Sequence, residues 1–262
     1  MFTFPPSKMV GGIFYEHGHR LIASGVGLLT IGLVIFVWRV DPRAWMKRLS
    51  LVGLAAVIAQ GVLGGLTVRY MLPAPISIGH AGLAQLFFCL TVSVAVFTSR
   101  WWLVPAAPPV DDARLRSRAL GLTALIYLQI LIGATMRHLG AGLAIPDFPL
   151  AFGRLVPPTW STQIAVHFAH RIVALAVIVW IVANAVWIRR RYSDRAELVR
   201  PSTWLVLVVL LQGTLGALVV LTAKHPVVNT LHVATGAIVV ATSLVVTLRA
   251  FRVRFPVPVR LS

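Results

Sequence analysis

HRLIASGVGLLTIGLVIFVWRV (residues 19–40) is an apolar run that opens with a histidine and an arginine. A second run of the same length, HRIVALAVIVWIVANAVWIRRR (residues 170–191), opens with the same pair. About 20 apolar residues are enough to cross a bilayer as a helix. Both runs therefore predict transmembrane helices, and the polar pair at the start of each needs an explanation.

The composition of the whole chain predicts an all-α, polytopic membrane bundle. Of the 262 residues, 58% are hydrophobic and 12% are charged, whereas soluble domains carry about 25% charged residues. In lipid the backbone must satisfy its own hydrogen bonds, which favours helices. Seven apolar runs are long enough to span the membrane: 18–38, 50–69, 77–98, 119–136, 164–187, 203–222 and 228–248.

The net charge of +17 follows the loops and therefore indicates topology, not nucleic-acid binding. Of the 24 Lys and Arg, 17 come after the first, third, fifth and seventh apolar runs. Lys and Arg concentrate in cytoplasmic loops, so we expect the N-terminus outside and the C-terminus in the cytoplasm. The single cysteine, Cys89, excludes a disulfide within the chain.

Polar landmarks recur at matched spacing, which predicts an internal duplication. AQGVLGGLTV, which contains Gln60, resembles LQGTLGALVV, which contains Gln212, and a histidine follows each glutamine after 20 residues, at His80 and His232. His19 precedes His80 by 61 residues, and His170 precedes His232 by 62 residues. Chance similarity of apolar runs would give one such match, but several aligned landmarks indicate duplicated halves.

The two predicted halves differ in length. Residues 1–117 form an N-terminal half-bundle with three helices, and residues 118–262 form a C-terminal half-bundle with four. The additional helix of the second half, at 119–136, has no counterpart in the first. Either one helix has been lost, or the recorded start lies inside a longer reading frame, and we favour the second explanation.

Four histidines at matched repeat positions are the candidate ligands: His19, His80, His170 and His232. A polar ring inside a membrane helix is costly and marks a functional site. Each pair comes from the first and third helices of the repeated unit, and non-adjacent helices leave room for a flat macrocycle between two imidazoles, since adjacent helices lie about 8–10 Å apart. Histidine is a usual axial ligand of haem iron, so we predict two bis-histidine haem sites.

Other roles for the neighbouring polar residues stay open. His167 and His170 are spaced so that both could reach one metal, although zinc prefers three or four converging ligands. His167 could equally lie outside any site. Arg20 and Arg171, which each follow a candidate ligand, could clamp haem propionates or extend to the membrane interface.

Glu16 marks only one of the two predicted sites. It precedes His19 by three residues and shares its face on a continuing helix, whereas its repeat counterpart is His167. One acid for two similar sites suggests that one half performs chemistry and the other a simpler task. The alternative is a carboxylate that caps the start of the helix. Asp147, in AIPDFPL, reads as a turn residue.

These motifs together resemble the haem A synthase family of cytochrome oxidase assembly. The resemblance rests on Glu16-x-x-His19-Arg20, on His80 in HAGLAQ, on His170-Arg171, on His232, and on GATMRHLGAGLAIPDFPL (133–150), which looks like the outer loop after the family's fifth helix. Family members have eight helices in two pseudo-symmetric halves. The first helix of that pattern is absent here.

The resemblance implies a reaction, the oxidation of the C8 methyl of haem O to a formyl group, which gives haem A. It implies that His170 and His232, with Arg171, bind a resident haem b, and that His19 and His80, with Arg20, hold the substrate haem beside the catalytic Glu16. It also implies a protein of the cell (inner) membrane. Haem O synthase and cytochrome oxidase assembly factors are the expected partners alongside lipid, and the oligomeric state, including a homo-oligomer, stays open.

Two competing functions remain from the sequence. The same four histidines could hold two b-type haems in a non-catalytic electron carrier, with Glu16 as a helix cap. A transporter built on repeats is less favoured, because the charge topology makes this repeat parallel and its helices are not broken at the midplane.

The distribution of basic residues predicts the outcome of a topology experiment. A reporter enzyme fused after Arg191 should behave as cytoplasmic, and one inserted between Ala151 and Pro157 should behave as external, because 17 of the 24 basic residues fall on one side. Paired alkaline phosphatase and fluorescent protein fusions measure this. Opposite signals at the two positions would overturn the predicted orientation.

Overall fold

The computed structural model describes residues 12–71, 73–104 and 107–255, with side chains from residue 16 onward. Within these residues seven helices are long and apolar enough to cross a membrane, which confirms the all-α polytopic prediction. Each predicted apolar run lies within or largely overlaps one of them. The helices are α1 (Gly12–Val40), α2 (Ala44–Arg69), α3 (Ala74–Thr98), α5 (Ala113–His138), α6 (Thr162–Arg191), α7 (Ala196–Leu221) and α8 (Pro226–Ala250), with short α4 (Arg100–Leu103), η2 (Ala141–Leu143) and η3 (Arg252–Arg254).

The chain forms two compact units that divide after Met71. In the first unit α1 packs on α2. The second unit contains α3 to α8. This division concerns packing, whereas the predicted repeat boundary at 117/118 concerns duplicated sequence, and that boundary stays a prediction.

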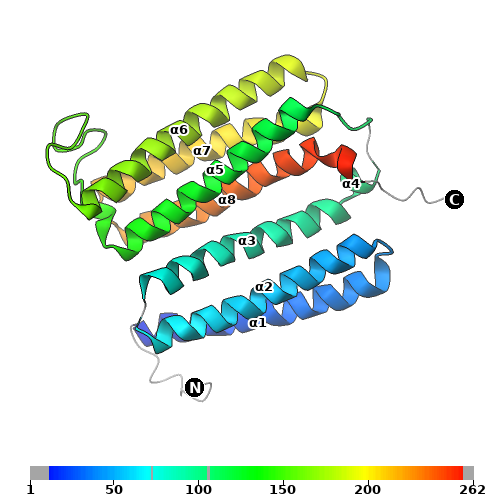
Figure 1. The fold of residues 1–262 in the computed structure, drawn as a ribbon, viewed down its shortest axis with the longest axis horizontal. Coiled ribbons are helices and arrows are strands. Elements are labelled where there is room, and N and C mark those ends of the chain that lie inside the picture. Colours follow the sequence, from blue (N-terminus) through cyan, green and yellow to red (C-terminus); the bar gives the residue numbers. More distant parts are fainter. Residues whose placement is uncertain (1–11, 72, 105–106, 256–262) are drawn as a thin grey trace. The chain divides into compact units, whose positions relative to one another are not determined.

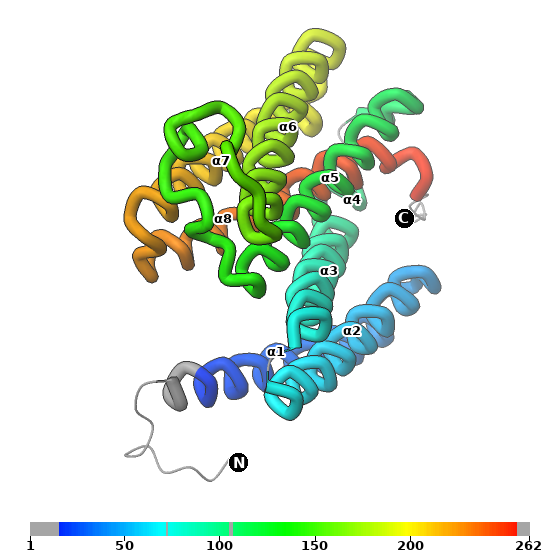
Figure 2. Tube along the Cα trace, turned by 60° about the vertical axis from the view of Figure 1, so that its left-hand side comes forward, coloured from blue at the N-terminus to red at the C-terminus, as the bar shows by residue number. Residues whose placement is uncertain are grey.

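In the second unit four helices form a closed bundle (Figures 1 and 2). α5 packs on α6 and on α8, and α7 packs on the same two helices. α6 and α8 therefore occupy opposite corners, with α5 and α7 between them. α3 lies alongside and packs on α5 and α8. This arrangement decides which helices can present ligands to one another across the bundle interior.

The centre of the bundle is apolar and receives residues from all four helices. Small polar groups join α5 to α8, where the Thr123 hydroxyl lies 2.7 Å from that of Ser243 and 2.9 Å from that of Thr247. Hydroxyl contacts of this kind hold helices together in membranes. The buried core residues are Leu122, Ile126, Val177, Ile181, Leu205, Val209, Val239 and Val240.

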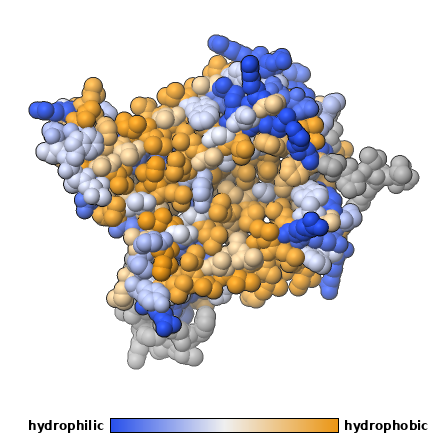
Figure 3. Space-filling view, viewed as in Figure 1, coloured by the Kyte–Doolittle hydropathy of each residue, from blue (hydrophilic) through white to orange (hydrophobic). Residues whose placement is uncertain are grey.

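The helix surfaces are suited to lipid. In each spanning helix only 11–33% of the most apolar window is buried within the protein, so most residues of these windows keep some exposed surface. Figure 3 shows hydrophobic residues along the helices, with hydrophilic residues gathered at helix ends, including the end of α6 at the upper right. Arg189, Arg190 and Arg191 form the last turn of α6. The chain is a multi-pass membrane protein.

Candidate functional site

His170 lies in the third turn of α6, on the face that packs against α5. The side-chain nitrogen of Gln129, on α5, is 3.0 Å from His170 Nδ1 and donates to the His170 backbone carbonyl at 2.8 Å. One turn further along α5 is Gly133. A Cβ atom built there would lie 3.0 Å from His170 Cε1, so the imidazole ring rests on bare helix backbone.

His232 lies in the second turn of α8 and has a matching environment on α7. Gln212 Nε2 is 3.5 Å from His232 Nε2. Gly216 follows one turn later, and a Cβ atom there would again lie 3.0 Å from the ring, at His232 Cε1. His232 Nδ1 is buried and has no hydrogen-bond partner in the structure. Each candidate ligand thus rests against a glutamine and a glycine of the preceding helix.

These residues fit a haem held by two histidines. α6 and α8 occupy opposite corners of the bundle, and a square of helices with sides of about 8–10 Å has a diagonal of about 11–14 Å. The axes of α6 and α8 are therefore farther apart than those of adjacent helices. Two imidazoles that bind opposite faces of one haem need this larger separation. The unpartnered Nδ1 of His232 is the second observation, because a buried ring nitrogen without a partner is costly unless something else satisfies it.

The candidates of the other predicted site lie in different units. Glu16 and His19 are on α1 and exposed, and Arg20 Nη2 forms an ion pair with Glu16 Oε1 at 2.5 Å. His80 is half-buried on α3, in the second unit. The helix begins at Gly12, so Glu16, His19 and Arg20 share one helical face as expected. The pairing of His19 with His80 stays a prediction.

Arg171 and His167 hold the loop that follows α5. The Arg171 guanidinium donates to the backbone carbonyls of Ile145 (3.1 Å), Asp147 (2.8 Å) and Leu150 (2.9 Å). Its Nε also lies 3.1 Å from His167 Nε2. A propionate would have to compete with these carbonyls for Arg171, and sequence reasoning missed this arrangement.

His167 is 3% exposed and lies between two donors. The backbone nitrogen of Ile145 approaches its Nδ1 at 3.2 Å and Arg171 approaches its Nε2, and a neutral imidazole accepts at one nitrogen only. His167 and His170 therefore have separate partners. Among the described residues, no group of three or more His, Cys, Asp or Glu side chains could hold a metal ion.

Asp147 organises the turn in this loop, as its sequence context indicates. Its carboxylate accepts from the backbone nitrogens of Phe152 and Gly153, both at 2.7 Å. Phe152 and Gly153 have φ angles of 58° and 74°, a region that is unfavourable for a bulky residue such as phenylalanine. The two backbone hydrogen bonds hold the pKa of Asp147 below its ordinary value and stabilise this turn.

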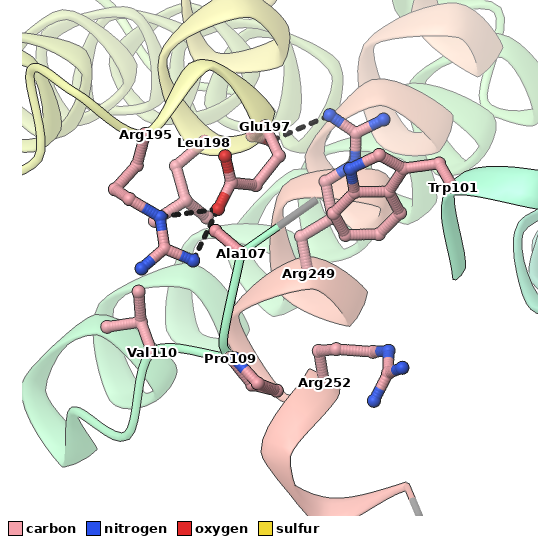
Figure 4. Close-up of a pocket in the computed structure, with 9 residues that line it drawn as sticks. All are labelled: Trp101, Ala107, Pro109, Val110, Arg195, Glu197, Leu198, Arg249 and Arg252. Carbon is pink, nitrogen blue, oxygen red and sulfur yellow. Dashed lines mark hydrogen bonds and ion pairs between the residues drawn. The ribbon is translucent and has the colours of Figure 1, made fainter. Parts of the chain in front are cut away.

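A small pocket at the far end of α8 from His232 contains no candidate ligand (Figure 4). Arg195 pairs with Glu197 there at 2.5 Å, and the Arg249 guanidinium lies 4.4 Å from the Trp101 ring centroid. These cations are occupied by protein partners, so the pocket serves to join the ends of α7 and α8 to the segment around α4.

Gln129 and Gly133 are site residues that the sequence interpretation missed. A signal for them was present. LQILIGATMR (128–137) carries the same glutamine–glycine spacing as AQGVLGGLTV and LQGTLGALVV, with Gly133 four residues after Gln129. The duplication of the two halves does not reveal it, because Gln129 and Gln212 lie in the same half.

Fold and site define a multi-pass helical membrane protein that carries matched histidines of the kind that ligate haem iron. The chain belongs to the family described as cytochrome oxidase assembly protein, whose model matches residues 7–245.

Curated relatives give the same result. The chain is 32% identical over 237 residues to a haem A synthase of Symbiobacterium thermophilum. The aligned region covers 88% of this chain and 76% of the relative. It is 29% identical to that of Geobacillus kaustophilus, over 87% and 72% of the two chains. It is 28% identical to that of Halalkalibacterium halodurans, over 83% and 73%.

The loop around Asp147 should loosen at low pH. A lowered pKa means that the charged carboxylate stabilises the folded loop above the ordinary pKa of 3.8, and that this stabilisation disappears as the pH falls through the lowered value. Asp147→Ala should remove this pH dependence and increase hydrogen exchange at Phe152 and Gly153. Asp194→Ala is the control. Unchanged exchange in Asp147→Ala would show that the turn does not depend on the carboxylate.

Proposed function

We propose that this chain is a haem A synthase, which oxidises the C8 methyl of haem O to a formyl group. The observation that carries the proposal is the pair of matched histidine environments on α6 and α8, at opposite corners of one bundle. The family membership and the names of the relatives support it.

We assign a resident haem b to the C-terminal bundle. His170 and His232 would hold its iron, each kept in place by the glutamine of the preceding helix. When bound, such a haem supplies one-electron redox chemistry. The apolar residues of the four helices exclude water from the space beneath these histidines.

We assign the substrate, haem O, to the N-terminal half. His19 and His80 would contact its iron, and Arg20 would hold a propionate. Glu16 would face the methyl group, where a fixed anion stabilises the positive charge that develops as the carbon is oxidised or accepts a departing proton. The ion pair with Arg20 limits the rotamers of Glu16, while an exposed pair of this spacing adds only about 0.3–0.5 kcal/mol to helix stability.

Arg171 can act on the haem b in one of two ways. The family resemblance assigns it to a haem propionate, whereas its hydrogen bonds in the structure go to the carbonyls of the 145–150 segment. Because its hydrogen bonds reach three carbonyls of one loop, we propose that it mainly fixes this loop over the outer end of the bundle and that any propionate contact is shared with that task.

The proposed setting is the cell membrane, with the N-terminus outside. The histidines lie at the starts of α6 and α8 and near the start of α1 and α3, which all begin on the same side if each helix crosses once. Both haem sites then face the outer leaflet. Haem O synthase would supply the substrate and cytochrome oxidase assembly would consume the product.

The resident haem should depend on the two histidines of the C-terminal bundle. His170→Ala and His232→Ala should each remove most of the low-spin haem b from the purified protein, because a bis-histidine site loses one of its two axial ligands. Pyridine haemochrome analysis and the low-spin EPR signal measure the loss, and exposed His225→Ala is the control. A complete bis-histidine signal in both variants would refute the assignment.

Glu16→Gln should separate catalysis from haem binding. The substitution keeps the size of the side chain but removes its charge, and loss of one such electrostatic partner lowers a rate by about a hundredfold or more. Conversion of supplied haem O to haem A, followed by chromatography of extracted haem, measures the effect. The haem held by His170 and His232 should be retained. His17→Ala, on a neighbouring side of α1, is the matched control.

Near-normal production of haem A by Glu16→Gln would contradict the catalytic role. It would leave the carboxylate with the local ion pair to Arg20 as its function.

A further inference from the structure

One five-residue pattern occurs in three of the spanning helices. A glutamine is followed four residues later by a glycine, with leucine or isoleucine between, in QGVLG (60–64), QILIG (129–133) and QGTLG (212–216). Each of these helices is followed by one that carries a candidate axial histidine. Residues four apart lie on the same face of a helix, so each glutamine and glycine can act on one target together.

In α5 and α6 the target is the ring of His170. Gln129 Nε2 lies within 3.0 Å of Nδ1 and is fixed by its 2.8 Å bond to the His170 carbonyl. Gly133 leaves room for the ring, because a Cβ atom at 3.0 Å from Cε1 would be closer than side chains normally tolerate. The neighbouring helix therefore fixes both a nitrogen and an edge of the imidazole.

In α7 and α8 the same arrangement recurs around His232. Gln212 approaches the ring at 3.5 Å, and a Cβ atom at Gly216 would lie 3.0 Å from Cε1. Gly236, one turn after His232, makes room for the glutamine in return, since a Cβ atom there would lie 3.2 Å from Gln212 Nε2. Two helix pairs thus place a glutamine and a glycine against a histidine ring in the same way, although the surrounding sequences differ.

Both glutamines have a buried acceptor without a partner. Gln129 Oε1 and Gln212 Oε1 make no hydrogen bond, and neither does His232 Nδ1. Buried polar atoms are rarely left in this way. A histidine that ligates a metal through one ring nitrogen presents an N–H at the other, and that N–H almost always finds an acceptor. In the structure each glutamine approaches its ring through Nε2, which is a donor. The unpartnered acceptor, Oε1, belongs to the same amide, so a rotation of that amide would present it to a ring N–H.

We propose that Gln129 with Gly133, and Gln212 with Gly216, are positioning residues for the axial histidines of the C-terminal haem. The glycine lets the imidazole approach the neighbouring helix backbone. Once the iron is ligated, the glutamine amide rotates and accepts the ring N–H through Oε1, at Gln129 in exchange for its bond to the His170 carbonyl. Partners of this kind orient the ring and raise ligand basicity. The inference rests on the proposed function, because it requires His170 and His232 to be the ligands.

The glycine half of the inference is tested with Gly133→Ala and Gly216→Ala. A methyl group at either position would push the ring out of place, so ferric protoporphyrin IX titrated into the haem-depleted full-length protein should bind about tenfold to a hundredfold more weakly. Gly53→Ala, where nothing lies within 4 Å of the added Cβ, should bind as the parent does. Parent-like affinity in both test variants would overturn this half.

The glutamine half is tested with Gln129→Met and Gln212→Met, which keep the length of the side chain but remove the amide. Both should retain haem yet show altered low-spin EPR g values and a higher midpoint potential, because the ligand histidine loses the acceptor that increases its basicity. Gln163→Met, at an exposed position near the start of α6, is the control.

Unchanged g values, potential and haem content in both methionine variants would overturn the glutamine role. The ligand assignment and the positioning inference fail in different ways. If His170→Ala and His232→Ala keep their haem, the ligand assignment is wrong. If they lose it while the glutamine and glycine variants behave as the parent, only the positioning inference is wrong.

Discussion

The structure depends on the cost of a polar group inside an apolar helical bundle. Within lipid, a side-chain nitrogen or amide can be satisfied only by another helix or by a bound group, because water is absent. The most apolar window of each spanning helix carries at most two Asp, Glu, Lys or Arg residues, so the polar side chains inside these helices are informative. In the second unit His170 and His232 each lie against a glutamine of the preceding helix, and hydroxyl groups of α5 and α8 pair with one another.

Because of this constraint, each candidate ligand in the C-terminal bundle depends on a pair of consecutive spanning helices. One helix supplies the histidine, and the helix before it supplies the glutamine and glycine against which the ring rests. Two such pairs, α5 with α6 and α7 with α8, close into a bundle whose ligand-bearing helices stand at opposite corners. We propose that this packing order brings two histidines to one haem, although the sequence contains no cluster of ligands.

Much of this could be predicted from the sequence, and the failures have physical reasons. Apolar length gave all seven spans, although α1 begins at Gly12 and not near residue 18, because helical backbone bonding continues past the apolar run. The turn at Asp147 was evident from its prolines. The contacts of Arg171 with three loop carbonyls were not predictable, because the path of a loop leaves no periodic signal. Gln129 was missed because its pattern repeats between helices of one half.

Chemical analysis of the haem formed from haem O tests the central claim most directly. Membranes that contain the full chain, supplied with haem O and a source of oxidising equivalents, should yield a haem that carries a formyl group, identified by the shift of its pyridine haemochrome band and by its mass. The account predicts this product in the parent protein. Recovery of unchanged haem O from a preparation with a complete bis-histidine haem signal would contradict it and would indicate an electron carrier.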